Sequence, residues 1–205
     1  MQQLKENVRR SIVTAAAESF MRNGYRGARL QDVAEIAGIS TGNLYRYYPD
    51  KSALFAAIVS SADAAQLLCL LRARVRELST APDWRVMTAA GSERAGALLT
   101  FFVEKRVQVV ILLAGSEESP LAHVRPLIVQ ELTRLSSAYL RQHVADPEAV
   151  VPRAVLQQLF INTVDMIVAI LRTHRDPASI QLSFSAFWRY QLAGLQALFK
   201  PQPKS

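Results

Sequence analysis

The chain has 205 residues, half of them hydrophobic, and carries 24 Lys and Arg against 17 Asp and Glu, a formal net charge of +7. This length can bury one substantial core, or the cores of a small and a larger domain. The basic surplus favours a polyanionic partner. The single cysteine, Cys69, excludes an internal disulfide.

No apolar run approaches the ~18 residues needed to span a bilayer. The run 109–115 is too short, and four polar residues interrupt the apolar stretch 155–171. Four charged side chains within residues 5–10 stand where the apolar core of a signal peptide would lie. We therefore expect a cytoplasmic protein, with Cys69 as a buried, inert thiol in its apolar segment.

Residues 30–51 predict two short helices around a tight turn. Apolar residues recur at i, i+3, i+4 and i+7 from Leu30, so 30–37 is expected to be a helix with one buried stripe. Gly38 ends this helix, because glycine tolerates the left-handed backbone that stops it. Ser40 or Thr41 can cap a second helix over 41–48. Pro49 limits this second helix to about two turns.

The second helix has an apolar side and a hydrogen-bonding side. Leu44 and Tyr48 share one face, whereas Gly42, Asn43, Arg46 and Tyr47 project from the opposite side. A short helix of this kind can lay its amino-terminal residues along the base edges of DNA.

The residue types on the outward side of the second helix can form contacts with DNA. Asn43 can read adenine bidentately, and Arg46 can read guanine or hold a phosphate. Gly42 lets the backbone come close, and Thr41, Tyr45, Tyr47 and Lys51 suit phosphate oxygens. The alternative is that the tyrosines are core aromatics. Considered singly, Tyr48 fits a core position better than a DNA contact, and Tyr45 fits the two roles equally well.

From Val8 to Phe55 the chain resembles the TetR/AcrR family of bacterial transcriptional repressors. The matching motifs are Phe20-Met-Arg-Asn-Gly-Tyr25, Asp32-Val-Ala34, Ala37-Gly-Ile-Ser40, Gly42-Asn-Leu-Tyr45, Tyr48-Pro-Asp-Lys51 and Leu54-Phe55. The resemblance implies base or nearby phosphate contacts at Thr41, Gly42 and Asn43, and backbone contacts at Tyr45, Tyr47 and Lys51. Arg29 stands where relatives often have Ser or Thr, so charge rather than a hydroxyl would supply its phosphate contact.

Residue chemistry and the family resemblance together give the expected DNA-binding residues. They are Arg29, Ser40, Thr41, Gly42, Asn43, Tyr45, Arg46, Tyr47 and Lys51.

Proline placement and long amphipathic stretches mark the remainder as helical. We expect helices near 5–23, 51–78, 92–113, 126–144, 152–173 and 177–199, with a short one near 83–90. Pro147 and Pro152 leave two possible starts for the helix before residue 173. The predicted fold is all-α: a three-helix helix-turn-helix domain over residues 1–50, and a larger helical ligand-binding and dimerisation domain over 51–205.

The last two expected helices have apolar residues over more than one face. Such wide faces suggest burial against both the domain's own core and a second copy of the chain. The alternative is a thick monomeric core. The candidate interface residues are Leu156, Phe160, Ile167, Phe184, Trp188 and Leu195.

The resemblance implies that the larger domain binds a small molecule, here expected to be apolar or aromatic. Candidate pocket residues are Trp84, Phe101, Phe102, Arg106, Tyr139, Phe160, Asn162, Asp165 and Met166; ordinary core packing is the alternative for each aromatic. The sequence lacks a nucleophile elbow, a P-loop and an HExxH motif, and its three histidines are scattered. We expect no enzyme activity, metal or cofactor.

The function predicted from sequence is therefore a homodimeric, ligand-responsive DNA-binding repressor. Two alternatives remain at this point: a helical enzyme or carrier domain with an auxiliary helix-turn-helix module, and a constitutive DNA binder.

Overall fold

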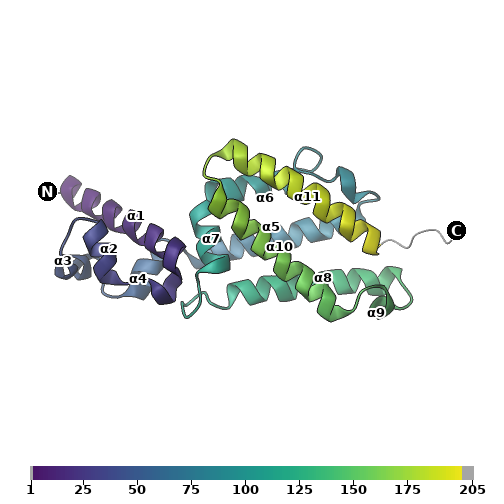
Figure 1. Ribbon diagram of the computed structural model, residues 1–205, viewed down its shortest axis with the longest axis horizontal. Helices are drawn as coiled ribbons and strands as arrows, with labels where there is room; N and C mark the ends of the chain where they lie inside the picture. Colours follow the sequence, from purple (N-terminus) through teal and green to yellow (C-terminus); the bar gives the residue numbers. More distant parts are fainter. Residues whose placement is uncertain (1, 200–205) are drawn as a thin grey trace. The chain divides into compact units, whose positions relative to one another are not determined.

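The computed structural model describes residues 2–199, and every regular element in that range is helical (Figure 1). The amino-terminal helices are α1 (Gln2–Gly27), α2 (Leu30–Ile36), α3 (Thr41–Tyr47) and α4 (Lys51–Ala56). The following elements are α5 (Ser61–Thr80), the 3-10 turn η1 (Trp84–Val86), α6 (Glu93–Glu104) and α7 (Arg106–Ala114). The last four are α8 (Val124–His143), α9 (Pro147–Val150), α10 (Arg153–Thr173) and α11 (Pro177–Phe199). The predicted all-α fold class is confirmed for these residues.

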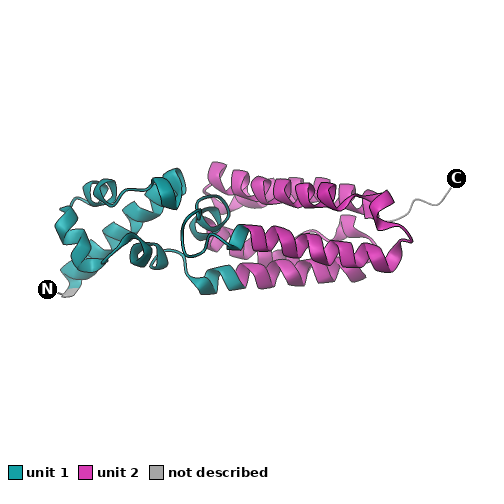
Figure 2. Ribbon diagram, turned by 90° about the horizontal axis from the view of Figure 1, so that it is seen from below, with its two compact units in different colours: residues 1–65, 107–125 teal, residues 66–106, 126–205 magenta. Residues whose placement is uncertain are grey.

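The chain forms two compact units (Figure 2). Unit 1 comprises residues 1–65 and 107–125, and therefore contains α1 to α4 and most of α7. Unit 2 comprises residues 66–106 and 126–205, and contains most of α5 and α8 together with η1, α6 and α9 to α11.

An aromatic cluster holds unit 1 together. Phe20 and Phe55 are almost fully buried, and their ring centroids lie 5.5 Å apart in an edge-to-face arrangement. Tyr25 completes the cluster, with its centroid 5.9 Å from that of Phe20 and 5.2 Å from that of Phe55. Such pairs stabilise a core by more than their buried area alone. The cluster therefore fixes α4 against the carboxyl-terminal half of α1.

Two glycines join α1 to the segment after α7, within unit 1. Gly24 interrupts α1 with a positive φ of 67°, and the next N–H, from Tyr25, donates to the Gly115 carbonyl at 2.6 Å. A Cβ atom on Gly115 would lie 3.1 Å from the Phe20 carbonyl oxygen and 3.3 Å from the Gly24 Cα. Arg26 and Glu118 add an exposed ion pair at 3.4 Å. The joint therefore requires glycine at position 24 for its positive φ and at position 115 for the close approach of the two backbones.

The single helix predicted over 51–78 is wrong, because α4 ends at Ala56 and α5 begins at Ser61. Ser60 and Asp63 form a reciprocal cap at this start. The Asp63 carboxylate accepts from the Ser60 backbone N–H at 3.0 Å, and the Ser60 hydroxyl accepts from the Asp63 N–H at 3.1 Å. This capping box satisfies backbone donors that would otherwise lack partners, and so starts a new helix.

The helix predicted over 92–113 is also two helices. Lys105 separates α6 from α7 with φ −105° and ψ 25°, outside the helical range. Both proline starts left open by the sequence are used, since Pro147 begins the short α9 and Pro152 precedes α10. Around 83–90 only the three-residue η1 is helical.

Unit 2 is a bundle whose long helices lie side by side (Figure 2). Its core contains the stacked rings of Phe102 and Phe184, with centroids 4.9 Å apart and both side chains fully buried. Helix α10 is long and apolar enough to cross a membrane by length and composition, and 44% of that stretch is buried within the fold. Eight of its side chains are buried, as expected of a core helix.

Cys69 is exposed, so the predicted burial of this thiol is wrong. Leu67 and Leu71, four residues apart on α5, are the buried residues of this stretch. Cys69 lies between them in sequence and projects from the other side of the helix. An apolar run that is continuous in sequence thus has only one buried face.

Candidate nucleic-acid interface

Helix α3 is fixed at both ends by local contacts. The Ser40 hydroxyl caps it by accepting the Asn43 backbone N–H at 3.2 Å, which confirms the predicted cap. Tyr48 ends the helix in extended backbone (φ −136°, ψ 112°), as the following Pro49 demands. Asp50 then caps α4 by accepting the Ala53 N–H at 2.7 Å. The helix is therefore two turns long, with its amino-terminal turn rigidly held.

The turn before α3 has the predicted glycine geometry. Gly38 has a φ of 70°, a left-handed conformation that side chains disfavour. The preceding α2 buries Val33 and Ala34. Arg29 occupies the N-cap position of α2 and makes no side-chain cap, so its guanidinium is not committed to the helix start.

Burial divides α3 into the two expected faces. Leu44 and Tyr48 are buried, which confirms that Tyr48 is a core aromatic. Tyr45, at 50% exposure, and Arg46 face solvent together with Gly42. Asn43 and Tyr47 are half-buried. The exposed face is therefore polar and rich in hydrogen-bonding groups.

A groove of about 600 Å³ runs along this part of unit 1. It brings together four of the predicted DNA-binding residues from α3 and the starts of α2 and α4. Its lining residues are Arg29, Leu30, Gln31, Thr41, Tyr45, Pro49, Asp50 and Lys51. Cations and hydroxyl groups along one open groove suit the phosphate oxygens of a nucleic-acid strand.

Lys51 has a structural role that its sequence position did not indicate. Its ammonium donates to the Arg26 carbonyl at 3.2 Å and lies 4.8 Å from the centre of the Tyr25 ring. Partial burial lowers the pKa of Lys51, and the nearby Glu118 carboxylate opposes that shift. The ammonium therefore closes the carboxyl-terminal end of α1 while remaining at the edge of the groove.

Arg9 contacts the residue that ends α3, a role that the sequence did not indicate. Its Nε donates to the Tyr48 hydroxyl at 3.2 Å, and its guanidinium lies 5.7 Å from the centre of the same ring. The hydrogen bond from Arg9 to Tyr48 raises the pKa of Arg9. Arg9 and Tyr48 are distant in sequence, so no local motif could have indicated this contact.

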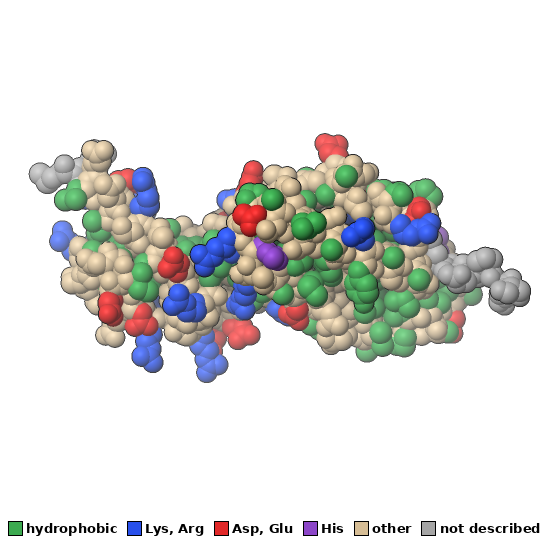
Figure 3. Space-filling model, turned by 45° about the horizontal axis from the view of Figure 1, so that its top comes forward, with side chains coloured by type: hydrophobic (Ala, Val, Ile, Leu, Met, Phe, Trp, Pro, Cys, Tyr) green, Lys and Arg blue, Asp and Glu red, His purple; other side chains and the backbone are tan. Residues whose placement is uncertain are grey.

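On the face of unit 1 that Figure 3 shows, Lys and Arg side chains are interspersed with Asp and Glu rather than joined into one basic field. Specific contacts, and not bulk charge alone, would therefore have to position DNA on this surface.

Unit 2 gathers three of the predicted ligand-binding residues around a small cavity. Trp84, Tyr139 and Phe160 line a space of about 60 Å³, together with Val75, Leu78, Ser79, Ser136, Leu195 and Phe199. Phe101 and Phe102 instead lie in the core.

The polar ligand-binding candidates lie elsewhere. Arg106 donates to the Leu171 carbonyl at 2.6 Å, and burial together with the nearby Arg175 lowers its pKa. Asn162, Asp165 and Met166 are exposed on α10 rather than inside a pocket. The sequence prediction had these three residues facing the inside of the bundle, whereas the structure has them on the solvent side of α10.

The structure also corrects the predicted dimer interface. Leu156, Phe160, Ile167 and Phe184 are buried within the single chain, where a second copy cannot reach them. Trp188 packs on Phe187 with ring centroids 4.8 Å apart, and is half-buried. Leu195 lines the cavity. Different side chains of α10 and α11 are exposed and apolar: Val155, Met166, Leu182, Tyr190 and Leu198.

Among residues 2–199, no group of three or more His, Cys, Asp or Glu side chains is placed to hold a metal ion.

Helix α2, the Gly38 turn and the capped α3 with its exposed polar face define the class of helix-turn-helix proteins. The sequence model described as bacterial regulatory proteins, tetR family, matches residues 12–58, the part of unit 1 that contains these elements. Within this segment the chain is similar to the TetR family.

Curated relatives match the same region. The transcriptional regulator RutR of Escherichia coli, and that of Shigella flexneri, are each 41% identical over 51 residues. These residues are 25% of this chain and 24% of RutR, so the match spans about a quarter of the length of these relatives.

Solved structures are similar over most of the chain at low identity. A TetR-family regulator from Streptomyces coelicolor has 20% identity and a TM-score of 0.47, covering 94% of this chain and 82% of that one. PfmR from Thermus thermophilus has 21% identity and a TM-score of 0.45, covering 90% and 98%.

Proposed function

We propose that this chain is a transcriptional regulator, acting in the cytoplasm as a repressor, that binds a specific double-stranded DNA operator through α3. The observation that carries the proposal is the polar, exposed face of a short helix whose amino-terminal turn is fixed by Ser40. That turn presents Thr41, Gly42 and Asn43, the residue types that approach and read base edges in a major groove.

Gly42 supports this proposal independently, because folding gives no reason for a glycine there. A Cβ atom at this position would meet nothing within 4 Å, and the backbone does not have a positive φ. Glycine within a helix costs roughly 0.5–1 kcal/mol relative to alanine. A closely approaching DNA backbone or base edge supplies the missing reason, since it would leave no room for a side chain.

The direct test is selection of bound sequences from random DNA by the full chain. We expect enrichment of one sequence containing two related half-sites, spaced by about one helical turn, roughly 34–36 Å. Asn43→Ala is the matched control and should relax base preference at one position of each half-site. Equal retention of all sequences would overturn the proposal and indicate a constitutive, non-selective DNA binder.

We further propose that the active species is a homodimer formed through α10 and α11. Leu182 and Tyr190 are 75% and 77% exposed in the single chain, and Leu198 is 41% exposed. Leu182 and Tyr190 lie about 80° apart around α11, with Ala186 between them, whereas Leu198 is turned about 80° further round the helix. Figure 3 shows hydrophobic side chains gathered on the surface of unit 2. A two-fold contact would remove such a face from water.

A small-molecule effector that binds unit 2 and lowers operator affinity completes the proposed function. The apolar cavity of unit 2 supports this step, because pockets for small molecules have mostly apolar walls. Coupling between two such sites is typically about 1–3 kcal/mol, or roughly 5- to 150-fold in affinity, and is reciprocal. Operator DNA should therefore weaken effector binding by the same factor, which paired titrations would measure.

A further inference from the structure

The cavity of unit 2 is built mainly from aromatic rings. The ring centroid of Trp84 lies 5.8 Å from that of Tyr139 and 5.6 Å from that of Phe199, while Tyr139 and Phe199 lie 6.3 Å apart. Phe160 and Leu195 extend the apolar wall. Ring pairs at these separations attract one another, and the same surfaces would attract a further ring.

Among the described residues, the lining of this cavity holds no charged side chain. Its polar members are Ser79 and Ser136, together with the hydroxyl of Tyr139. The indole N–H of Trp84 is already bonded, donating to the Leu78 carbonyl at 2.6 Å. Burying a charge here would leave it without a partner of opposite sign, at high cost. The lining therefore selects for a neutral molecule.

Trp84 lies on a short covering segment. The 3-10 turn η1 is part of the connection between α5 and α6, and Trp84 is its one buried residue. The Trp84 backbone N–H donates to Gln196 Oε1 at 2.7 Å. Two hydrogen bonds and ring contacts thus hold this end of the connection over the cavity.

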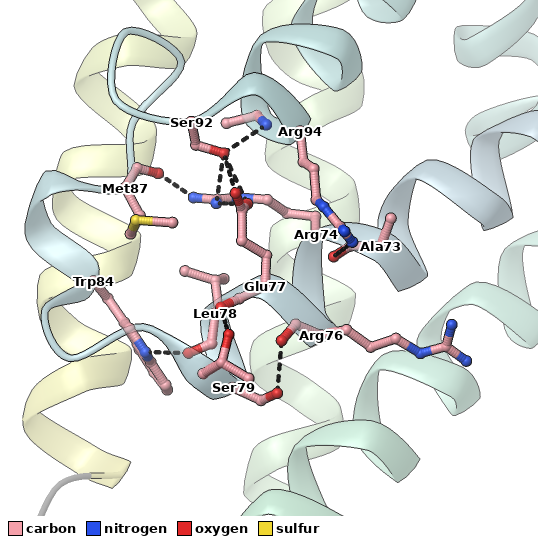
Figure 4. A network of polar contacts seen from close by, with 12 residues as sticks. Ala73, Arg74, Arg76, Glu77, Leu78, Ser79, Trp84, Met87, Ser92 and Arg94 are labelled. Atoms are coloured by element: carbon pink, nitrogen blue, oxygen red, sulfur yellow. Dashed lines mark hydrogen bonds and ion pairs between the residues drawn. The ribbon is translucent and has the colours of Figure 1, made fainter.

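An ion pair and hydrogen bonds hold the other end of the connection, from Met87 to Ser92. Arg74 on α5 donates to the Met87 carbonyl and pairs with Glu77 at 2.6 Å (Figure 4). Ser92 donates to the Glu77 carboxylate at 2.7 Å and caps α6. Burial lowers the pKa of Arg74, and its bond to Glu77 opposes that shift. The Met87–Ser92 end is therefore anchored to α5 by contacts that do not involve Trp84.

We propose that this cavity is the effector site, that its ligand is a neutral, one-ring aromatic molecule, and that the ligand enters by displacing Trp84 and η1. The volume of about 60 Å³ is well below the ~150 Å³ of an apolar cavity that binds benzene, so the cavity must enlarge to hold a ring. Displacement of Trp84, whose indole forms one wall, would supply that room. This inference rests on the proposed regulatory function, for which it names the ligand class and the site.

The test uses p-xylene as the probe and p-toluenesulfonate as its charged counterpart of similar shape. The chain has two tryptophans, so Trp188→Phe leaves Trp84 as the single indole reporter. We expect p-xylene to give saturable heat by calorimetry and a saturable change in Trp84 fluorescence. We expect p-toluenesulfonate to give neither.

Two substitutions locate the binding. Leu195→Phe fills the cavity and should abolish the saturable heat, whereas Leu127→Phe, at an exposed position of α8, should leave it unchanged. If Leu195→Phe fails to fold by thermal unfolding, Ser136→Leu supplies a second filling variant. Absence of p-xylene binding to the wild type, binding that persists in a folded filling variant, or equal binding of p-toluenesulfonate would each overturn the inference.

DNA titrations separate this inference from the proposed function. Cavity binding of p-xylene that leaves affinity for the selected operator unchanged would support a ligand site here and overturn its regulatory role. Selective operator binding without any p-xylene binding would overturn the cavity inference alone.

Discussion

Helices α3 and α11 both face solvent in the single chain, but their exposed surfaces differ in chemistry. Helix α3 exposes Gly42, Tyr45 and Arg46, and water can form hydrogen bonds with this polar surface as well as a partner would. Helix α11 exposes Leu182 and Tyr190 in one apolar stripe, which water does not satisfy. The comparison supports the two kinds of partner that we propose: a polyanion that associates reversibly with α3, and a second copy that covers α11 permanently.

The largest expected effect comes from making the α11 stripe polar. Leu182→Glu combined with Tyr190→Glu should give a folded monomer, because both side chains are exposed within the chain. With only one recognition helix per molecule, operator affinity should fall by about 10²–10⁴, the gain that simultaneous binding usually provides. Sedimentation and DNA titration would measure the two effects. A wild type that sediments as a monomer at micromolar concentration would contradict this prediction.

The next effect concerns base reading by α3. Asn43→Ala should cost ~1–3 kcal/mol of discrimination at one base pair, because a bidentate contact is lost. Binding to the selected operator and to a copy changed at that base pair would show it. A variant that discriminates as well as the wild type would mean that Asn43 does not face a base.

Lys51→Ala provides the contrast to Asn43→Ala. It should weaken all DNA sequences alike and reduce the slope of log affinity against log salt by about one. Because Lys51 also closes the end of α1, its removal should lower the melting temperature as well. Unchanged salt dependence together with a lower melting temperature would assign Lys51 to the fold alone.

Gly42→Ala should separate folding from binding. The free protein should gain roughly 0.5–1 kcal/mol, since alanine restricts the unfolded chain and has open space at this position. Operator affinity should fall by about tenfold, or ~1.4 kcal/mol, if DNA packs against the Gly42 Cα. Thermal unfolding and DNA titration test the two halves. A stabilised variant with full affinity would show that DNA does not approach this position closely.

The smallest effect is a pH dependence of stability in unit 2. Hydrogen bonds from Arg134, and then from Arg72, hold the pKa of Glu131 at about 2, below its usual 4.5. This lowered pKa stabilises the fold above pH 4.5, and the contribution is lost as the pH falls through about 2. Glu131→Gln should lower stability by roughly 0.2–1 kcal/mol at neutral pH. Unfolding curves of both proteins should converge near pH 2, and a constant difference would contradict the assignment.

Features encoded within a few residues could be predicted from the sequence. Ser40, Gly38 and Asp50 set the ends of α2, α3 and α4 through contacts no more than five residues away. The start of α5 was encoded in the same way, because Ser60 and Asp63 have the spacing of a capping box. This capping signal was present in the sequence. It ends the helix predicted from the apolar periodicity of residues 51–78 and starts α5.

Features that depend on distant contacts could not be predicted. Apolar periodicity identifies the helix face that becomes buried, but it does not show whether the chain itself or a second copy buries that face. Phe184 was therefore expected at an interface, and lies stacked on Phe102 instead. The break at Lys105 and the bond from Arg9 to Tyr48 likewise have no local signal. Trp84, Tyr139 and Phe160 line one cavity, and they were grouped in the prediction only because large aromatic residues favour apolar cavities.

The joint between Gly24 and Gly115 carries a consequence for how this sequence can diverge. Gly24 requires a positive φ of 67°, and a Cβ atom on Gly115 would lie only 3.3 Å from the Gly24 Cα. A mutation at one position therefore cannot be compensated by a larger residue at the other. In any lineage that keeps this joint, both positions should therefore stay glycine.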